Sequence, residues 1–265
     1  MKPVFTVAPV RSRIDSPIHI TASGLIPGER VTIRTKVMDG ALREWESLAV
    51  VDADDVGAVD LSRMAPLEGS TYRGVDGEGP LWSMQGPDQS KFFTRNLPVE
   101  LEYHSELCRG DRVIASTRFR RHFGDGVTWG QMHEPPVIGT FAHPNDGLPH
   151  PGALVLHGSD SVDLASAATL LASEGYSVLA LRWFGVEGRP AHMVNVELND
   201  IDCAVTCMIN NEFVVGDKIA VIGLSRGAEL ALEVAAHNAN VGLTIALSPS
   251  SIRQAGMGEN YSFKD

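Results

Sequence analysis

One pentapeptide has the residue types and spacing of a hydrolase nucleophile. It reads Gly223-Leu224-Ser225-Arg226-Gly227, a G-x-S-x-G motif. In enzymes built on this motif the serine hydroxyl attacks a carbonyl carbon, and the glycines leave room for a sharp turn between a strand and a helix. An apolar run precedes the motif and an Ala- and Leu-rich segment follows it. The context predicts that Ser225 is a nucleophile; the alternative is a serine that only caps the following helix.

A nucleophilic serine also needs N–H groups that stabilise the developing oxyanion. The N–H of Arg226 lies at the expected helix start, where backbone amides are unpaired and the helix dipole favours an anion. A second donor would come from the loop after an earlier strand. The segment LHGSD, residues 156–160, follows an apolar run and offers the N–H groups of Ser159 and Asp160. These two residues are interpreted either as the rest of an oxyanion hole or as a plain turn that caps the next helix.

The elements that would position these residues can be read from the second half of the chain. Short apolar runs alternate there with segments of helical period, which is the pattern of a parallel sheet with helices on its faces. The expected strands are 137–144, 153–158, 176–183, 218–223 and 242–249, and the expected helices are 162–173, 198–209 and 226–237. We therefore predict an α/β domain over residues 135–265.

The first half lacks a helical period and is rich in alternating or β-branched segments separated by turn residues. The expected strands are 19–23, 31–38, 47–53, 99–105 and 112–120, with a long loop from Met64 to Gln89. Several short strands with regular turns predict an all-β, immunoglobulin-like antiparallel sandwich over residues 1–134. Pro135-Pro136 marks the expected boundary between the two domains.

Composition opposes several classes of protein. The net charge of −11 argues against nucleic acid as a partner, because phosphate binding needs a basic surface. No apolar run approaches the ~18 residues of a membrane span, and the N-terminal segment lacks the apolar core of a secretory signal. Three cysteines make no disulfide framework. We therefore expect a reducing, cytoplasmic location.

The charge is uneven along the chain. Residues 1–134 carry sixteen Lys and Arg against nineteen Asp and Glu, whereas residues 135–265 carry six against fourteen. The first half also holds a cationic cluster, Arg118, Arg120 and Arg121. The cluster is interpreted either as a solvated strand face or as a rim that attracts an anionic substrate.

Three histidines, His143, His150 and His157, recur every seven residues. Because they fall on a strand, a turn and another strand, they do not share one face. We expect solvated loop histidines there rather than metal ligands. We expect no metal site and no cofactor in this chain.

Several stretches resemble the acyl-CoA thioesterase and bile acid-CoA:amino acid N-acyltransferase family. They are GLSRGAELAL, SVLALRWFG and ALSPSS near the motif, and DSPIHITASGLIPGERVTIRT, AVDLSRMAPLEGSTYRGVDGEGPLWSM and VIGTFAHP before them. The resemblance implies an N-terminal sandwich domain joined to an α/β-hydrolase domain. It also implies a role in lipid metabolism, through acyl transfer from a coenzyme A thioester by way of an acyl-enzyme on Ser225. In this family a serine here goes with the thioesterases and a cysteine with the amino-acid acyltransferase. Ser225 therefore favours hydrolysis, with N-acyl transfer as the alternative.

The rest of a catalytic triad is not found after the motif. In α/β-hydrolases the triad runs Ser, acid, His along the chain. The one later histidine, His237, lies on the expected helix about three turns, or ~18 Å, from Ser225. Residues 135–265 are also short for such a domain, which usually needs ~200 residues. We expect a domain whose C-terminal part is missing, with a sheet edge that favours association into oligomers. A non-catalytic homologue that binds an acyl chain or a partner is the third alternative.

Overall fold

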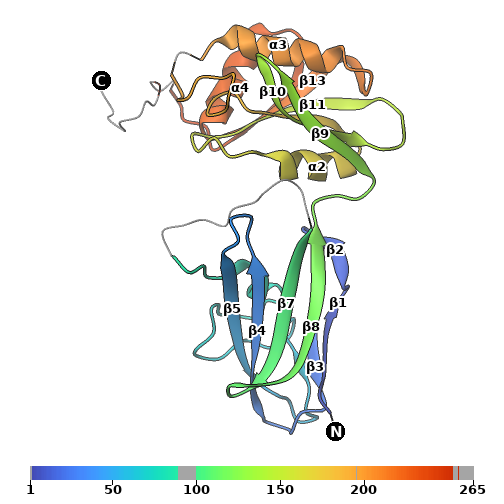
Figure 1. Ribbon diagram of the computed structural model, residues 1–265, viewed down its shortest axis with the longest axis vertical. Helices are drawn as coiled ribbons and strands as arrows, with labels where there is room; N and C mark the ends of the chain where they lie inside the picture. Colours follow the sequence, from blue (N-terminus) through green and yellow to red (C-terminus); the bar gives the residue numbers. More distant parts are fainter. Residues whose placement is uncertain (1, 89–99, 195, 253–255, 257–265) are drawn as a thin grey trace. The chain divides into compact units, whose positions relative to one another are not determined.

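The computed structural model describes residues 2–88, 100–194, 196–252 and 256, and the chain divides into two compact units, Met1–Phe123 and Gly124–Asp265 (Figure 1). The division thus lies between Phe123 and Gly124, whereas the change of sequence pattern predicts it near Pro135. The reason is that Val127–Glu134, strand β9, forms a hairpin with Val137–Pro144, strand β10. The Pro135-Pro136 pair is the turn of that hairpin and not a linker.

The first unit contains two β-sheets. One sheet has the order β1-β3-β6, and the other has the order β2-β8-β7-β4-β5. Their strands are β1 (Val4–Ala8), β2 (Arg11–Arg13), β3 (His19–Ser23), β4 (Arg30–Met38), β5 (Glu44–Asp52), β6 (Val59–Asp60), β7 (Leu101–Arg109) and β8 (Arg112–His122). All pairings are antiparallel except that of β2 with β8. Within the predicted loop there is one helical turn, α1 (Gly79–Trp82).

The two sheets share one apolar core, which confirms the predicted sandwich. Alternate residues of β4 point inward, so that Val31, Ile33 and Val37 are buried while their neighbours are not. They belong to the same cluster as Val7 and Ile20 of the other sheet. All five predicted strands are present, although residue 99 of the fourth lies outside the described residues. The sequence missed β1, β2 and β6. The last two have only three and two residues, which carry too little alternation to be recognised.

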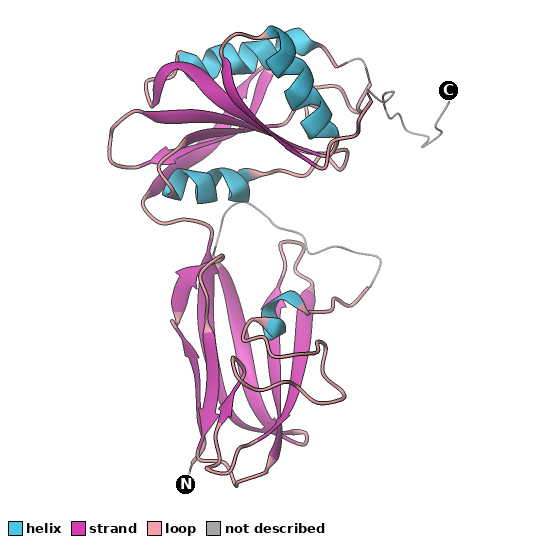
Figure 2. Ribbon diagram, turned by 180° about the vertical axis from the view of Figure 1, so that it is seen from behind, coloured by secondary structure: helices cyan, strands magenta, loops and turns pink. Residues whose placement is uncertain are grey.

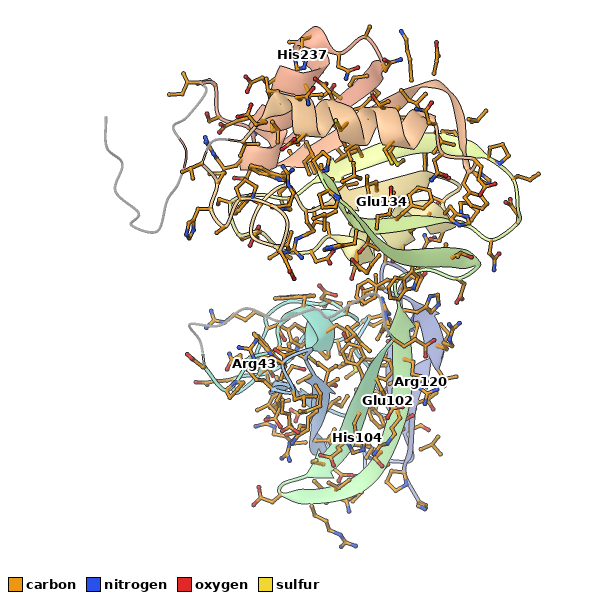
Figure 3. The ribbon with its side chains drawn as sticks, turned by 45° about the horizontal axis from the view of Figure 1, so that its top comes forward. Arg43, Glu102, His104, Arg120, Glu134 and His237 are labelled. Carbon is orange, nitrogen blue, oxygen red and sulfur yellow. The ribbon has the colours of Figure 1, made fainter. Side chains whose placement is uncertain are left out.

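The cationic cluster of β8 divides between two environments. Arg118 and Arg120 lie on the exposed sheet face, where both donate to the Glu102 carboxylate. Figure 3 labels Arg120 and Glu102. This pairing favours the interpretation as a solvated strand face. Arg121 points the other way and is buried, with Nη2 donating to the carbonyl oxygens of Ile14 and Ser16. Arg121 is therefore part of neither a solvated face nor an exposed rim, because successive side chains of a strand alternate in direction.

The second unit is the predicted α/β domain, a mostly parallel sheet with helices on both faces (Figure 2). Its strand order is β14-β13-β11-β12-β10-β9, and β10 runs antiparallel to both of its neighbours. The remaining strands are β11 (His150–Leu156), β12 (Ser177–Leu181), β13 (Val214–Leu224) and β14 (Val241–Leu247), and the helices are α2 (Ala165–Ser173), α3 (Leu198–Ile209) and α4 (Arg226–His237). Strands β11, β12, β13 and β14 are parallel, so their carboxyl ends meet at one edge of the sheet. The predicted strands and helices of this half are all present.

Each face of this sheet has its own core. Leu154 and Leu156 of β11 pack with buried residues of α3 and α4. Ala153 and Val155 of the same strand pack on the other side, against Ala168 of α2. The continuous apolar runs of the sequence follow from this arrangement, because strands covered on both faces have no polar side.

The outermost strand, β14, carries exposed apolar side chains. Leu243, Ile245 and Leu247 alternate along it and are 57%, 39% and 49% exposed. In the described part of the chain β14 pairs with β13 alone, so its other edge has free backbone groups. An unpaired edge with an apolar row favours self-association.

We expect the protein to associate in a concentration-dependent manner through β14. Leu243→Lys should weaken the apparent association constant about tenfold, since it removes roughly 1.4 kcal/mol of apolar burial. Light scattering over a concentration series measures this. Leu148→Lys, at a similarly exposed leucine in the β10–β11 turn, is the matched control and should change nothing. A stable monomer at all concentrations would contradict the prediction.

Candidate active site

Ser225 is the single residue between β13 and α4, and its backbone conformation is strained. Its φ is 53° and its ψ is −114°, a region that non-glycine residues rarely adopt. Its N–H donates to the carbonyl of Leu247 at the end of the neighbouring strand, at 2.8 Å. The hydroxyl makes no capping hydrogen bond to α4. The capping alternative is therefore wrong, and the side chain is exposed at the carboxyl edge of the sheet.

Both glycines of the motif are required by close backbone contacts. A Cβ on Gly223 would lie 2.1 Å from the Gly227 carbonyl oxygen. A Cβ on Gly227 would lie 2.4 Å from the carbonyl oxygens of both Leu156 and His157. The start of α4 thus packs directly against the ends of β13 and β11, and only hydrogen atoms fit in these gaps.

The loop after β11 reaches the serine. A Cβ on Gly158 would lie 3.5 Å from Ser225 Cβ, so Gly158 and Ser225 are in contact distance of each other. Within the described residues, the N–H groups of Ser159 and Asp160 donate to no protein oxygen. Neither residue caps α2, because Asp163 Oδ1 accepts from the N–H of Ala165, at 2.9 Å. The capping interpretation is therefore not supported, and the oxyanion-hole interpretation of Ser159 and Asp160 stays a prediction.

Arg226 supplies the third element of this arrangement. Its N–H belongs to the first residue of α4, a position with no acceptor inside the helix. The fold thus brings Ser225, the Arg226 amide and the loop of Ser159 and Asp160 to one edge of the sheet.

Two of the three regularly spaced histidines are buried, which corrects the expectation of solvated loop residues. His143 and His157 are almost completely covered, and only His150 lies partly in solvent. His157 stacks on Trp183 and also contacts Phe184. Burial lowers the pKa of His157, so its ring is neutral at neutral pH. Residues that follow a strand directly can still be buried when a neighbouring loop covers them, which the local pattern does not reveal.

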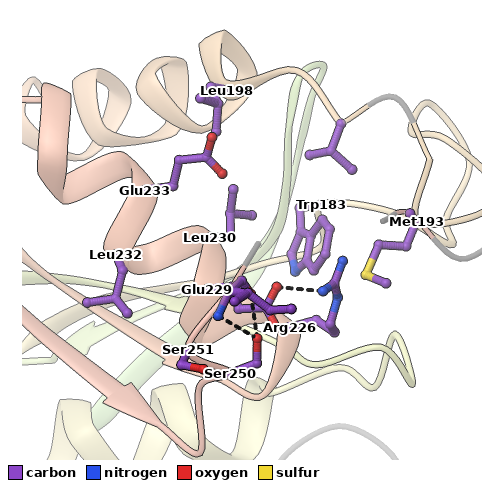
Figure 4. Close-up of a pocket in the computed structure, with 13 residues that line it drawn as sticks. Trp183, Met193, Leu198, Arg226, Glu229, Leu230, Leu232, Glu233, Ser250 and Ser251 are labelled. Atoms are coloured by element: carbon purple, nitrogen blue, oxygen red, sulfur yellow. Dashed lines mark hydrogen bonds and ion pairs between the residues drawn. The ribbon is translucent and has the colours of Figure 1, made fainter. Parts of the chain in front are cut away.

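A cavity of about 600 Å³ opens beside α4 (Figure 4). Its apolar wall is formed by Trp183, Met193, Val196, Leu198, Leu230 and Leu232, and its polar side by Arg226, Glu229, Glu233, Ser250 and Ser251. Arg226 and Glu229 form an ion pair of 2.5 Å within it. Of these residues, only Arg226 is a site residue predicted from the sequence. The others come from segments far apart in the chain, although Glu229, Leu230 and Glu233 could have been found by their spacing on α4.

No base for Ser225 is found among the residues that the structure describes: neither a histidine nor a carboxylate hydrogen-bonds to its hydroxyl. His237 ends α4, and its Nε2 lies 3.1 Å from Asp202 Oδ2 (Figure 3). The same described residues contain no group of three or more His, Cys, Asp or Glu that could hold a metal ion. None of the described helices is long and apolar enough to cross a bilayer.

The pairing of His237 makes a prediction about its titration. The hydrogen bond with Asp202 raises the pKa of His237 above its ordinary value of ~6.5. Asp202→Asn should return the pKa toward ~6.5, as an NMR titration of the ring would show. Because the folded pKa is the higher one, the pairing stabilises the fold at low pH and this contribution is lost as pH rises through the folded pKa. An unchanged titration in the variant would contradict the pairing.

Comparison with known families identifies the relatives of this site. The model of the acyl-CoA thioester hydrolase/BAAT N-terminal region matches residues 15–134. The model of the BAAT/acyl-CoA thioester hydrolase C-terminal region matches residues 196–261 and includes the elbow at Ser225. The chain belongs to this family. The N-terminal match ends at residue 134, where the sequence pattern also changes.

Individual members of the acyl-CoA thioester hydrolase/BAAT family align over most of the chain. Acyl-coenzyme A thioesterase 3 of Mus musculus is 30% identical over 259 residues, which are 95% of this chain and 59% of that protein. Peroxisomal succinyl-coenzyme A thioesterase of Mus musculus is 31% identical, over 91% of this chain and 59% of that protein. Mitochondrial acyl-coenzyme A thioesterase 2 of Homo sapiens is 28% identical, over 91% of this chain and 51% of that protein. The chain therefore spans between half and two thirds of the length of these relatives.

Solved structures resemble the chain less closely. A dienelactone hydrolase from Klebsiella pneumoniae is 18% identical, with a TM-score of 0.42. The match covers 49% of this chain and 63% of that protein. A dienelactone hydrolase-like phosphotriesterase from metagenomic libraries is 18% identical, with a TM-score of 0.39. The match covers 47% of this chain and 60% of that protein.

Proposed function

We propose that this protein hydrolyses acyl-CoA thioesters through an acyl-serine intermediate on Ser225. The single observation that carries the proposal is the strained, uncapped Ser225 held beside unpaired amides of a second loop. In this mechanism Ser225 Oγ attacks the thioester carbonyl, the sulfur of coenzyme A leaves as the thiol, and water then releases the acid. Acyl-CoA is the substrate, and no cofactor takes part.

The proposal assigns each group a role. The amides of Arg226, Ser159 and Asp160 stabilise the oxyanion of both tetrahedral intermediates. Gly223 and Gly227 permit the elbow. The apolar wall of the cavity at Trp183 and Leu230 receives the acyl chain, since apolar side chains there exclude water from it. Relatives named as thioesterases support this substrate class.

Hydrolysis is favoured over transfer to an amino acid because a serine occupies position 225. The implied place in the cell stays a prediction: the expected location is cytoplasmic, whereas two of the relatives are named as mitochondrial and peroxisomal. The implied role is in lipid metabolism.

Incubation with palmitoyl-CoA tests the proposal directly. The expected result is release of free thiol together with palmitic acid, with or without glycine and taurine in the mixture. Thiol release is followed with a thiol-reactive chromophore, and the acyl product is identified by mass spectrometry.

Two other outcomes would overturn it. N-palmitoylglycine or N-palmitoyltaurine as the main product would assign the chain to the N-acyltransferases. Thiol release no faster than in the absence of protein would mark a homologue that binds the acyl chain or a partner without catalysis.

A further inference from the structure

His157 has contacts that suggest a role at the site. Its Nδ1 lies 2.8 Å from the carbonyl oxygen of Gly158, the next residue. A carbonyl oxygen only accepts hydrogen bonds, so Nδ1 carries the proton and the neutral ring is the Nδ1–H tautomer. Nε2 has no partner in the described structure although it is fully buried. The buried ring thus makes one hydrogen bond, and that bond goes to the loop beside Ser225.

The hydrogen bond from His157 is the shorter of two that hold one peptide group, since the carbonyl of Gly158 also accepts from the N–H of Ser161 at 3.4 Å. The carbonyl of Gly158 and the N–H of Ser159 are opposite ends of the same planar unit. Holding the carbonyl therefore holds the direction of the N–H. A glycine flanks this unit, and glycine lets a peptide rotate more freely than other residues do, so an unheld unit could turn its N–H away.

The ring itself is fixed by its surroundings. Trp183 stacks on it with ring centroids 5.2 Å apart, and Phe184 lies 5.0 Å away at a tilt. The indole N–H of Trp183 donates to the carbonyl of His157, at 3.1 Å. The same carbonyl oxygen lies against Gly227 at the start of α4. These contacts hold the ring in the orientation in which Nδ1 faces the carbonyl of Gly158.

We infer that His157 is a positioning residue that holds the Gly158–Ser159 peptide so that the Ser159 N–H stays available to the oxyanion at Ser225. The inference rests on the proposed function and adds to it a residue that touches no substrate. His157 acts through the Nδ1–H group alone. A side chain that keeps a donor at the δ position should therefore replace it, and one that moves the donor further out should not.

Two substitutions separate these cases. In His157→Asn the amide Nδ2 occupies the place of the ring Nδ1, whereas in His157→Gln the amide lies near the place of Nε2. The readout is the reaction of Ser225 with an alkyl fluorophosphonate, measured by intact mass as the maximal rate constant and the half-saturating concentration. Loss of one oxyanion donor predicts a rate constant ~10²- to 10³-fold lower in His157→Gln. The half-saturating concentration should stay the same, and His157→Asn should react within ~10-fold of the wild type.

His143 offers a matched control. Its Nδ1 also bonds to the carbonyl of the next residue, Pro144, at 2.7 Å, and its ring stacks on Phe213. It lies at the opposite edge of the sheet, because β10 is antiparallel and Ala142 pairs with Val178 at the start of β12. His143→Gln should lower the thermal midpoint as much as His157→Gln and leave the labelling of Ser225 unchanged.

The outcomes distinguish a failure of the positioning role of His157 from a failure of the proposed function. Equal rate constants in wild type and folded His157→Gln would overturn the inference and leave the proposed function intact. If His157→Gln does not fold, a folded His157→Asn that has lost more than ~100-fold in rate constant overturns it as well. No adduct on Ser225 in the wild type would overturn the proposed function, and the inference with it.

Discussion

Ser225→Ala is expected to abolish formation of a covalent adduct with fluorophosphonates and acyl-CoA, and to lower the rate of thiol release. The reason is that the hydroxyl at the elbow is the group that forms the bond, and an alanine leaves nothing to acylate. Peptide mapping after labelling should place the adduct on the segment that contains Ser225.

The wild-type rate should nevertheless be modest. No described histidine or carboxylate hydrogen-bonds to the Ser225 hydroxyl, so the amides of the oxyanion hole act without a base in contact. Sites that lose triad members keep ~10³- to 10⁴-fold catalysis over water. The loss relative to an intact triad is about 10⁴- to 10⁶-fold, or ~5 to 8 kcal/mol of barrier.

Ser248→Ala is the matched control for Ser225→Ala. Ser248 is also an exposed serine with a positive φ, 54°, and it follows the neighbouring strand β14. Its replacement should leave both labelling and thiol release unchanged. Rapid turnover that survives Ser225→Ala would refute the assignment, and rapid turnover that depends on Ser225 would reveal a base outside the described contacts.

Gly227→Ala is expected to cost about 2 kcal/mol of unfolding free energy and to eliminate labelling of Ser225. Two effects oppose each other here. Alanine stabilises a helix by about 1 kcal/mol relative to glycine, and Gly227 lies in the first turn of α4. The new Cβ would, however, lie 2.4 Å from two backbone carbonyl oxygens, which cannot move aside as a side chain can. Overpacking of this kind costs ~1 to 3 kcal/mol and occasionally more, so the clash outweighs the helix preference.

Gly130→Ala gives the control for that measurement. Gly130 lies on β9 in the same unit, and a Cβ there would meet nothing within 4 Å. Its replacement should stabilise the protein slightly, by up to ~1 kcal/mol, because glycine disfavours strands. Urea unfolding of both variants measures the difference. Equal stabilities would mean that α4 does not pack against the ends of β11 and β13 as described.

The sequence alone determined the elements around the elbow. The expected helix 226–237 has the bounds of α4, and the expected strand 218–223 lies within β13. Their patterns are local: periodic apolar residues, a glycine-flanked turn and a change of period at each end. The position of Ser225 between strand and helix follows from the same local pattern, as does the candidate loop of Ser159 and Asp160 after its strand.

Only the tertiary structure decided which residues meet and which side chains are covered. Arg121 and His157 are polar and follow no apolar period, yet both are buried because distant segments cover them. The sequence pattern predicts a domain boundary at Pro135-Pro136, but the pairing of β9 with β10 makes these two residues a hairpin turn. The cavity brings together Trp183, which follows β12, and Leu230 of α4. These features depend on contacts between residues far apart in the chain. A local sequence pattern cannot predict such contacts, because they form only when the sheet has assembled.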